Sequence, residues 1–376
     1  METRYLIKAT VVTPVHVGAG QEKKLIYGVD FFYDNNEKKI IVIDQSKAYS
    51  MMPPTQKELY ISYLADGKLN EFFNRFRNLR EEIIRSSTVA VINSPSGDPN
   101  NNEILPMISS PGKNGRQVYI PGSSIKGALR SVIYARFYEK MKKHEHENYE
   151  TNFFGRIDNN LMSFIHVSDA PVSNSRIIRT KIYNLRKEGY EIIAGWKNDR
   201  YNTSSEFMPA GFVTYLEAVP AGEEFEFSVK INRERINYLK SKRYNNLPKH
   251  LGFFENLTLK DLFSMINWHS KRYLIAEKEF FEHYNNGEDY SEDIIEEISR
   301  IINLIPSGNN KCLFHLGFGS GFHGITGNWK FPENHIDTGE LKKGMPQYKS
   351  RRMFFKEERS SYSFMPLGFI LLEAST

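Results

Sequence analysis

The chain has 376 residues, of which 50 are Lys or Arg and 45 are Asp or Glu, so its formal net charge is +5. Hydrophobic residues make up 40% and aromatic residues 13%, which excludes a mainly disordered chain. The single cysteine, Cys312, excludes an intramolecular disulfide framework and any metal site built from several cysteines. The small basic excess is compatible with an anionic partner but does not require one.

The N-terminal residues alternate like a strand and lack the apolar core of a signal peptide. The longest apolar stretches, such as Phe369–Leu372, are far shorter than the roughly 20 residues of a membrane helix. We therefore expect a soluble, cytoplasmic protein with no membrane partner.

The first half of the chain mixes strands, helices and one long loop. Tyr5–Val15 alternates as a strand, and the residues around Asp34-Asn35-Asn36-Glu37 predict a hairpin. The apolar spacing is helical over about residues 46–87, which predicts a helical insertion. Residues 93–115 are rich in Pro, Gly, Ser and Asn and predict a loop, followed by the short strand Gln117–Ile120.

The second half continues this interleaving. Ser123 is a suitable N-cap for a helix that carries its apolar stripe through Phe137. The further predicted strands are 163–167, 177–182, 190–194, 212–219, 224–231 and a closing strand at 362–372, and the firmest helices are 259–281 and 294–305. Because no regular βαβ rhythm is present, the sequence predicts an α+β fold with antiparallel sheets.

Two short motifs are candidates for ligand contact. Glycines directly after a strand, at Gly18 and Gly20, let a ligand approach the backbone, and His16 adds a donor or a base. An ordinary tight loop is the alternative. Downstream, Ser123, Ser124, Lys126 and Arg130 at a helix start form a natural anion site, although the Walker spacing is absent. A capped surface helix is the alternative there.

A glycine-rich loop at 317–327 is the third candidate. Its glycines and aromatic rings predict a backbone cradle with stacking platforms, and the residues singled out are Gly317, Phe318, Gly319, Gly321 and Phe322. The dinucleotide-binding fingerprint fits formally from Gly319 to Gly324, but no helix-forming run follows and no βαβ unit surrounds it.

Charge is segregated along the chain. Basic clusters lie at residues 176–187, which include Arg179 and Lys181, at 233–243 and at 342–352, whereas acidic residues gather at 288–297. Basic groups among aromatic residues suit a phosphate backbone with unstacked bases, and a solvated face is the alternative.

No catalytic constellation stands out. The sequence lacks both a Gly-x-Ser-x-Gly elbow and a His-Glu-x-x-His motif, and His144 and His146 are too close in sequence to converge on a metal. We predict no catalytic residue, no metal and no cofactor. The alternative is an endoribonuclease that uses His16 as a base or Asp30 to hold a divalent ion.

Taken in order, several motifs resemble the RAMP superfamily of CRISPR-associated RNA-binding proteins. They are Thr13–Gly20, Tyr119–Arg130, Asn152–Gly155 with Ser168-Asp169-Ala170, Met208–Gly211 and the loop at 317–327. The length, the helical insertion and the late glycine loop look most like the Csm-five-type subunits of type III-A CRISPR–Cas (Csm) effector complexes.

That resemblance implies ferredoxin-like (RRM-like) RAMP domains, with an N-terminal one at 1–220 and a largely helical C-terminal region at 221–376. It implies a non-enzymatic subunit that caps the 3′ end of the crRNA. The implied partners are crRNA, target RNA, the repeating backbone subunit, the small helical subunit and host nucleases that trim the 3′ end. RNA contacts are implied on the three motifs described above.

Overall fold

The computed structural model describes most of the chain. The described residues are 3–99, 102–112, 115–138, 153–156, 160–199, 202–241, 251–319, 341–342, 345–346, 350–359 and 361–375.

A five-stranded antiparallel sheet forms the centre of the molecule, in the order β15-β20-β1-β14-β8. Its strands are β1 (Thr3–Val11), β8 (Ile165–Val167), β14 (Glu224–Ile231), β15 (Lys311–His315) and β20 (Phe369–Ala374). The helices that join them are α5 (Gly122–Tyr138) and α9 (Leu259–His283). The succession β1–α5–β8–β14–α9–β20 is the β-α-β-β-α-β arrangement of ferredoxin-like folds, with β15 added at one edge.

This sheet forms because alternate residues are apolar. Ile7, Ala9 and Val11 of β1 are buried, whereas the intervening Lys8 is exposed and Thr10 is half-buried. The buried side packs against Leu129 of α5 and against α9 in one core cluster. The core sequence pattern therefore sets which face of β1 the two helices cover.

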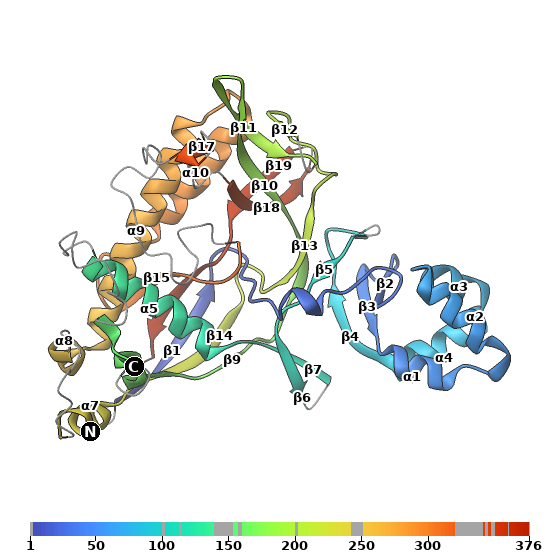
Figure 1. The fold of residues 1–376 in the computed structure, drawn as a ribbon, viewed down its shortest axis with the longest axis horizontal. Helices are drawn as coiled ribbons and strands as arrows, with labels where there is room; N and C mark the ends of the chain where they lie inside the picture. The colour runs from blue at the N-terminus through green and yellow to red at the C-terminus, as the bar shows by residue number, and fades with distance from the viewer. Residues whose placement is uncertain are drawn as a thin grey trace.

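A larger ten-stranded sheet adjoins the first one (Figure 1). Its strands are β2 (Phe31–Asp34), β3 (Lys39–Ile43), β4 (Thr88–Asn93), β5 (Ile104–Leu105), β10 (Arg176–Glu188), β11 (Glu191–Lys197), β12 (Thr203–Ser204), β13 (Thr214–Ala218), β18 (Ser350–Glu358) and β19 (Ser361–Pro366). The helix α10 (Asp289–Asn303) and the second half of α9 pack on it around Tyr183 and Trp196.

The predicted helical insertion is confirmed and lies at one end of the molecule, beyond β2 and β3 (Figure 1). It consists of α1 (Gln45–Met51), α2 (Pro54–Ala65), α3 (Leu69–Arg75) and α4 (Arg77–Ser87). Tyr60, Phe72 and Phe73 form the centre of its separate core cluster. This part therefore carries its own buried apolar centre and connects to the body mainly through β2–β4.

The smaller elements surround these layers. A three-stranded sheet contains β6 (Ser109–Gly112), β7 (Gly115–Ile120) and β9 (Ala170–Pro171), and the β6–β7 hairpin projects from the body (Figure 1). The others are η1 (Gln21–Lys23), η4 (Leu161–Phe164), α7 (Arg233–Ser241), α8 (Leu251–Asn256), β16 (Leu341–Lys342) and β17 (Met345–Pro346).

Antiparallel α+β architecture is confirmed, but several local predictions need correction. The stretch 93–115 is not a simple loop, because Ile104 is fully buried and pairs with Leu25, so β5 and β6 form within it. The predicted strand at 362–372 turns at Leu367-Gly368 and divides into β19 and β20, which belong to different sheets.

Strand pairing does not follow the predicted division at residue 220. The ferredoxin-like succession takes β1, α5 and β8 from one side of it and β14, α9 and β20 from the other. In the described part of the chain, no helix is both long enough and apolar enough to cross a membrane.

Candidate nucleic-acid interface

The early and late glycine motifs form one structure, although about three hundred residues separate them. The Phe318 N–H donates to the carbonyl oxygen of His16 at 2.8 Å. Gly317 has φ +99°, and a Cβ at this position would lie 2.6 Å from that same carbonyl oxygen. Only glycine fits this close approach, so the contact with the early loop requires glycine at position 317.

His16 holds this junction from the inside. Its side chain is 2% exposed, and its Nδ1 lies 2.6 Å from the carbonyl oxygen of Glu217. Because a carbonyl only accepts, Nδ1 carries the proton, and burial lowers the pKa of His16. The His16 side chain is therefore buried in this conformation, and its contact with RNA stays a prediction. Gly18 and Gly20, in contrast, are exposed as predicted.

Main-chain hydrogen bonds continue from this junction to the motif at the start of α5. Ile108 N–H donates to the Val17 carbonyl at 3.0 Å, and Tyr119 N–H donates to the Ile108 carbonyl at 3.3 Å. Tyr119 belongs to β7, which leads directly into α5. The three motifs selected from the sequence are thus connected through successive backbone contacts.

The start of α5 differs from the prediction in one respect. The helix begins at Gly122, after Pro121, so Ser123 lies in the first turn and is not the N-cap. The Gly122 N–H donates to the Asp169 carboxylate at 2.8 Å, which is a favourable place for an anion at a helix N-terminus. Part of the predicted anion site is therefore occupied by a side chain of the protein. Ser123 is exposed and Ser124 half-buried.

Lys126 and Arg130 lie one turn apart on the same helix and are both half-buried. Burial lowers the pKa of Lys126. The Arg130 guanidinium lies 4.6 Å from the ring centroid of Phe154, a cation–π geometry that fixes its position. The predicted pair of basic residues at the beginning of α5 thus exists with one member anchored on an aromatic ring.

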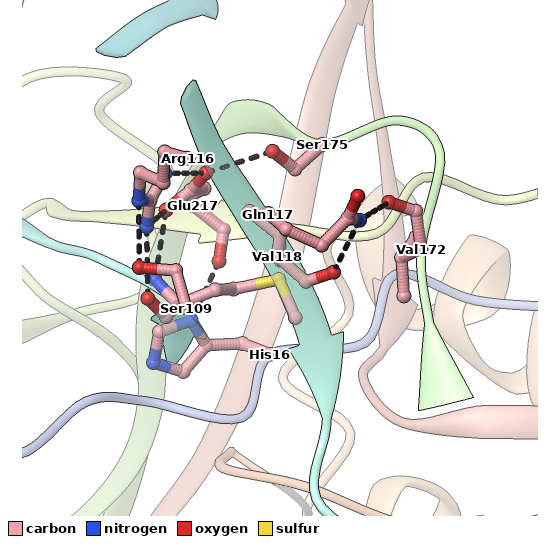
Figure 2. A network of polar contacts seen from close by, with 9 residues as sticks. His16, Ser109, Arg116, Gln117, Val118, Val172, Ser175 and Glu217 are labelled. Atoms are coloured by element: carbon pink, nitrogen blue, oxygen red, sulfur yellow. Dashed lines mark hydrogen bonds and ion pairs between the residues drawn. The ribbon is translucent and has the colours of Figure 1, made fainter. Parts of the chain in front are cut away.

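A buried ion pair lies behind these motifs (Figure 2). The Glu217 side chain is fully buried, and its two oxygens accept from Arg116 Nη1 and Nη2 at 2.6 and 2.7 Å. Met107 N–H and Ser175 Oγ also donate to this carboxylate. The sequence analysis missed this group, although a lone acid in the apolar strand Thr214–Ala218 is a signal of a buried, paired charge.

Phe318 and Arg352 form the exposed side of the junction. Phe318 is 40% exposed, and the Arg352 guanidinium lies 5.2 Å from its ring centroid. Arg352 Nη1 donates to Thr180 Oγ1 at 3.0 Å, and burial lowers the pKa of Arg352 to about 10. The sequence analysis selected the basic cluster at 342–352 as a group and did not distinguish Arg352 within it. Gly319 is described and half-buried, whereas Gly321 and Phe322 lie outside the described residues.

Arg179 and Lys181 point to the same face of β10, but they have different surroundings. Lys181 is fully buried in this conformation, and its contact with RNA stays a prediction. Its ammonium donates to three carbonyl groups, those of Met208, Ala210 and Gly211, and burial lowers its pKa to about 8. Arg179 is half-buried and lines an open pocket.

The residues of the ribonuclease alternative have structural roles here. Asp30 Oδ2 accepts from the Ile26 N–H at 2.8 Å and closes a turn. Within the described ranges, no group of three or more His, Cys, Asp or Glu side chains is arranged to hold a metal ion.

Comparison with known proteins gives consistent matches. A family model described as the RAMP superfamily matches residues 8–323. A CRISPR system protein named Csm5 from Methanocaldococcus jannaschii is 25% identical over 364 residues, which are 89% of this chain and 76% of that protein.

Solved structures share the fold. A chain from the cryo-EM structure of a Csm–crRNA–target RNA ternary complex of a type III-A CRISPR–Cas system has a TM-score of 0.60 at 17% identity, covering 99% of this chain and 100% of that one. The crystal structure of T. onnurineus Csm5 has a TM-score of 0.54 at 14% identity, covering 96% and 99%.

Proposed function

Because the chain belongs to the RAMP superfamily, we propose that it is a crRNA-binding structural subunit of a type III-A CRISPR effector complex. In this role it binds the 3′ part of the crRNA and leaves sequence recognition to base pairing between guide and target RNA. The relatives named Csm5 and the chain from a Csm–crRNA–target RNA complex support this choice of complex.

One observation carries the proposal. Three motifs that lie far apart in the sequence are joined by the contacts of Phe318 with His16, of Ile108 with Val17 and of Tyr119 with Ile108. They place exposed glycines, an exposed ring and the basic start of α5 in one connected region. Accessible backbone, an aromatic platform and basic side chains are what a single-stranded RNA requires of a protein.

We assign the RNA contacts to the accessible members of this region, which are Gly18, Gly20, Ser123, Lys126, Arg130 and Phe318. His16 and Glu217 act behind them as positioning residues, because their contacts fix the loop from the buried side. Neighbouring Csm subunits complete the binding surface, and trimming of the crRNA 3′ end falls to recruited nucleases. The engagement of His16 and Asp30 in structural hydrogen bonds favours this non-enzymatic role.

The test is RNA binding by a pair of substitutions that removes two positive charges, Lys126→Gln with Arg130→Gln. Each phosphate contact to single-stranded RNA contributes about 0.7 to the slope of log affinity against log salt, so losing two contacts lowers the slope by about 1.4. Glutamine keeps most of each side-chain stem and removes the charge. The matched control is Arg77→Gln with Arg85→Gln, two exposed positions on α4 that remove the same net charge.

The measurement is crRNA affinity over a salt series for the purified protein. We expect a lower slope and weaker binding only in the α5 variant. Equal slopes in the wild type and the α5 variant would refute the assignment of phosphate contacts to this helix. Complexes purified without this subunit should carry crRNA with altered 3′ ends, and unchanged ends would refute the capping role.

A further inference from the structure

A pocket of about 410 Å³ lies on the face of β10 that carries Arg179, opposite the face on which Thr180 accepts a hydrogen bond from Arg352. Its volume lies in the range of about 300–1,000 Å³ that is usual for ligand sites. The lining combines an arginine, aromatic rings, main chain and short polar side chains. The residues are Ser96, Asp98, Asn102, Arg179, Pro209, Ala210, Gly211, Phe212, Val213, Tyr215 and Tyr362.

Buried Lys181 fixes one wall of this pocket. Its ammonium donates to the carbonyl oxygens of Met208, Ala210 and Gly211, the last two at 3.0 Å. The same ammonium lies 5.6 Å from the ring centroid of Phe207. A charge-assisted bond to each of three carbonyls leaves this loop little freedom, so the residue that follows it has a defined position.

That residue is Phe212, and its backbone is strained. Its φ is +47°, in the left-handed region that bulky side chains avoid. The side chain is nevertheless 41% exposed, so burial of the ring does not offset the strain. One face of the ring is covered by Lys197 Nζ, 4.2 Å from the centroid. Strain of this kind concentrates where a ligand needs a side chain in a particular place.

Arg179 supplies unused hydrogen-bonding capacity on the other side. Its guanidinium lies 4.8 Å from the ring centroid of Phe355, a cation–π distance that favours this position. Its Nε is buried and has no hydrogen-bond partner among the described residues. A stacked guanidinium with a donor to spare is suited to pair with a base edge or a phosphate oxygen.

We propose that this pocket holds one unpaired RNA base, with Phe212 as its stacking platform and Arg179 as its polar anchor. The inference rests on the proposed binding of single-stranded RNA and adds a place where a single nucleotide turns out of the bound strand. Ser96 and Asn102 also line the pocket and are polar, as expected of a site that recognises an extruded base. Lys181 is the positioning residue, because it acts only through the loop that carries Phe212.

The experiment compares Phe212→Leu, Phe212→Trp and the wild type in binding single-stranded RNA that carries 4-thiouridine for cross-linking. Tyr190→Leu is the control, because Tyr190 is a fully exposed aromatic residue at the turn between β10 and β11. We expect Phe212→Leu to weaken binding about 5- to 100-fold, the range for loss of one stacked base, with an unchanged salt slope. Phe212→Trp should retain binding, and RNA should quench its tryptophan fluorescence more than it quenches that of the wild type.

Cross-links should map to residues 209–213 or to Tyr362. If the wild type binds RNA and Phe212→Leu binds equally well, the pocket proposal fails while the proposed function stands. If the wild type binds no RNA, the proposed function fails and this inference with it. If Phe212→Leu proves unfolded by thermal melting, the Trp variant decides: unquenched fluorescence on saturation with RNA overturns the proposal.

Discussion

Replacing Arg116 by Met tests whether the buried ion pair holds the candidate interface together. Glu217 is fully buried, so the substitution leaves an ionised carboxylate without its cation. Removal of one partner of a buried pair typically costs about 3–5 kcal/mol. Because Met107 N–H and Ser175 Oγ still donate to the carboxylate, we expect the lower end, about 3 kcal/mol.

The double variant Arg116→Met with Glu217→Met separates this charge effect from simple loss of packing. It removes the uncompensated carboxylate, so it should be less destabilised than the sum of the two single variants by about 2 kcal/mol. Urea unfolding followed by circular dichroism measures all four proteins. Comparable m-values show that the free energies refer to the same transition.

Additive single-variant effects, with a coupling below about 0.5 kcal/mol, would refute the reasoning. The same series reports on function. Since the Glu217 carbonyl accepts from His16 Nδ1, a loosened Glu217 should also weaken RNA binding by the neighbouring loop. Intact RNA affinity in a strongly destabilised Arg116→Met protein would separate the ion pair from the interface.

Three further predictions concern other buried groups. Lys181→Met should weaken RNA binding without changing the salt slope, because its ammonium contacts only the protein; a lowered slope in a salt series would instead indicate a direct phosphate contact. Burial lowers the pKa of His315 to about 3, below the unfolded value near 6.5, so this residue favours folding above pH 6.5 and loses that contribution as the pH falls. His315→Phe should therefore reduce the free energy of unfolding that is lost between pH 6.5 and 5 by about 2 kcal/mol, as measured by urea titrations at each pH. An unchanged pH dependence would contradict this. Gly28→Ala should make the helical insertion more susceptible to limited proteolysis, because the new Cβ would lie 1.9 Å from the Gly67 carbonyl oxygen. The control is Gly97→Ala, which also has a positive φ but no atom within 4 Å of the new Cβ, so it should cost only about 1–2 kcal/mol. Equal effects of the two substitutions would exclude the clash.

Periodicity was sufficient to predict the fold class and most long elements. The helical insertion and α9 carry strong apolar spacing, and the structure confirms both. Periodicity was insufficient where a strand forms by pairing with a segment that is distant in the sequence. Ile104 lies in a strand inside a polar stretch because β13 pairs with it, and β20 separates from β19 because it pairs with β1 while β19 pairs with β18.

The candidate site shows the same limit. Motifs in the sequence indicated the loops at 16–20 and 317–319, and the structure connects them. Burial reversed the interpretation of His16 and Lys181, since both residue types look like surface ligands when read without their neighbours. Glu217 and Phe212 had no motif at all, because their importance lies in a buried pairing and in a backbone angle.

The pairing of β1 with β20 also determines when the protein can become functional during synthesis. Ile7 and Val11 of the first strand pair with Ala374 and Ile370, so the central sheet cannot close until these residues have been translated. Contacts between such distant residues slow folding and leave early segments exposed. The Gly368 N–H donates to the Pro14 carbonyl oxygen, so the loop at 16–20 acquires its shape only after residue 368 has been added. A nascent chain therefore cannot capture RNA through this junction until residues 368–374 have emerged from the ribosome.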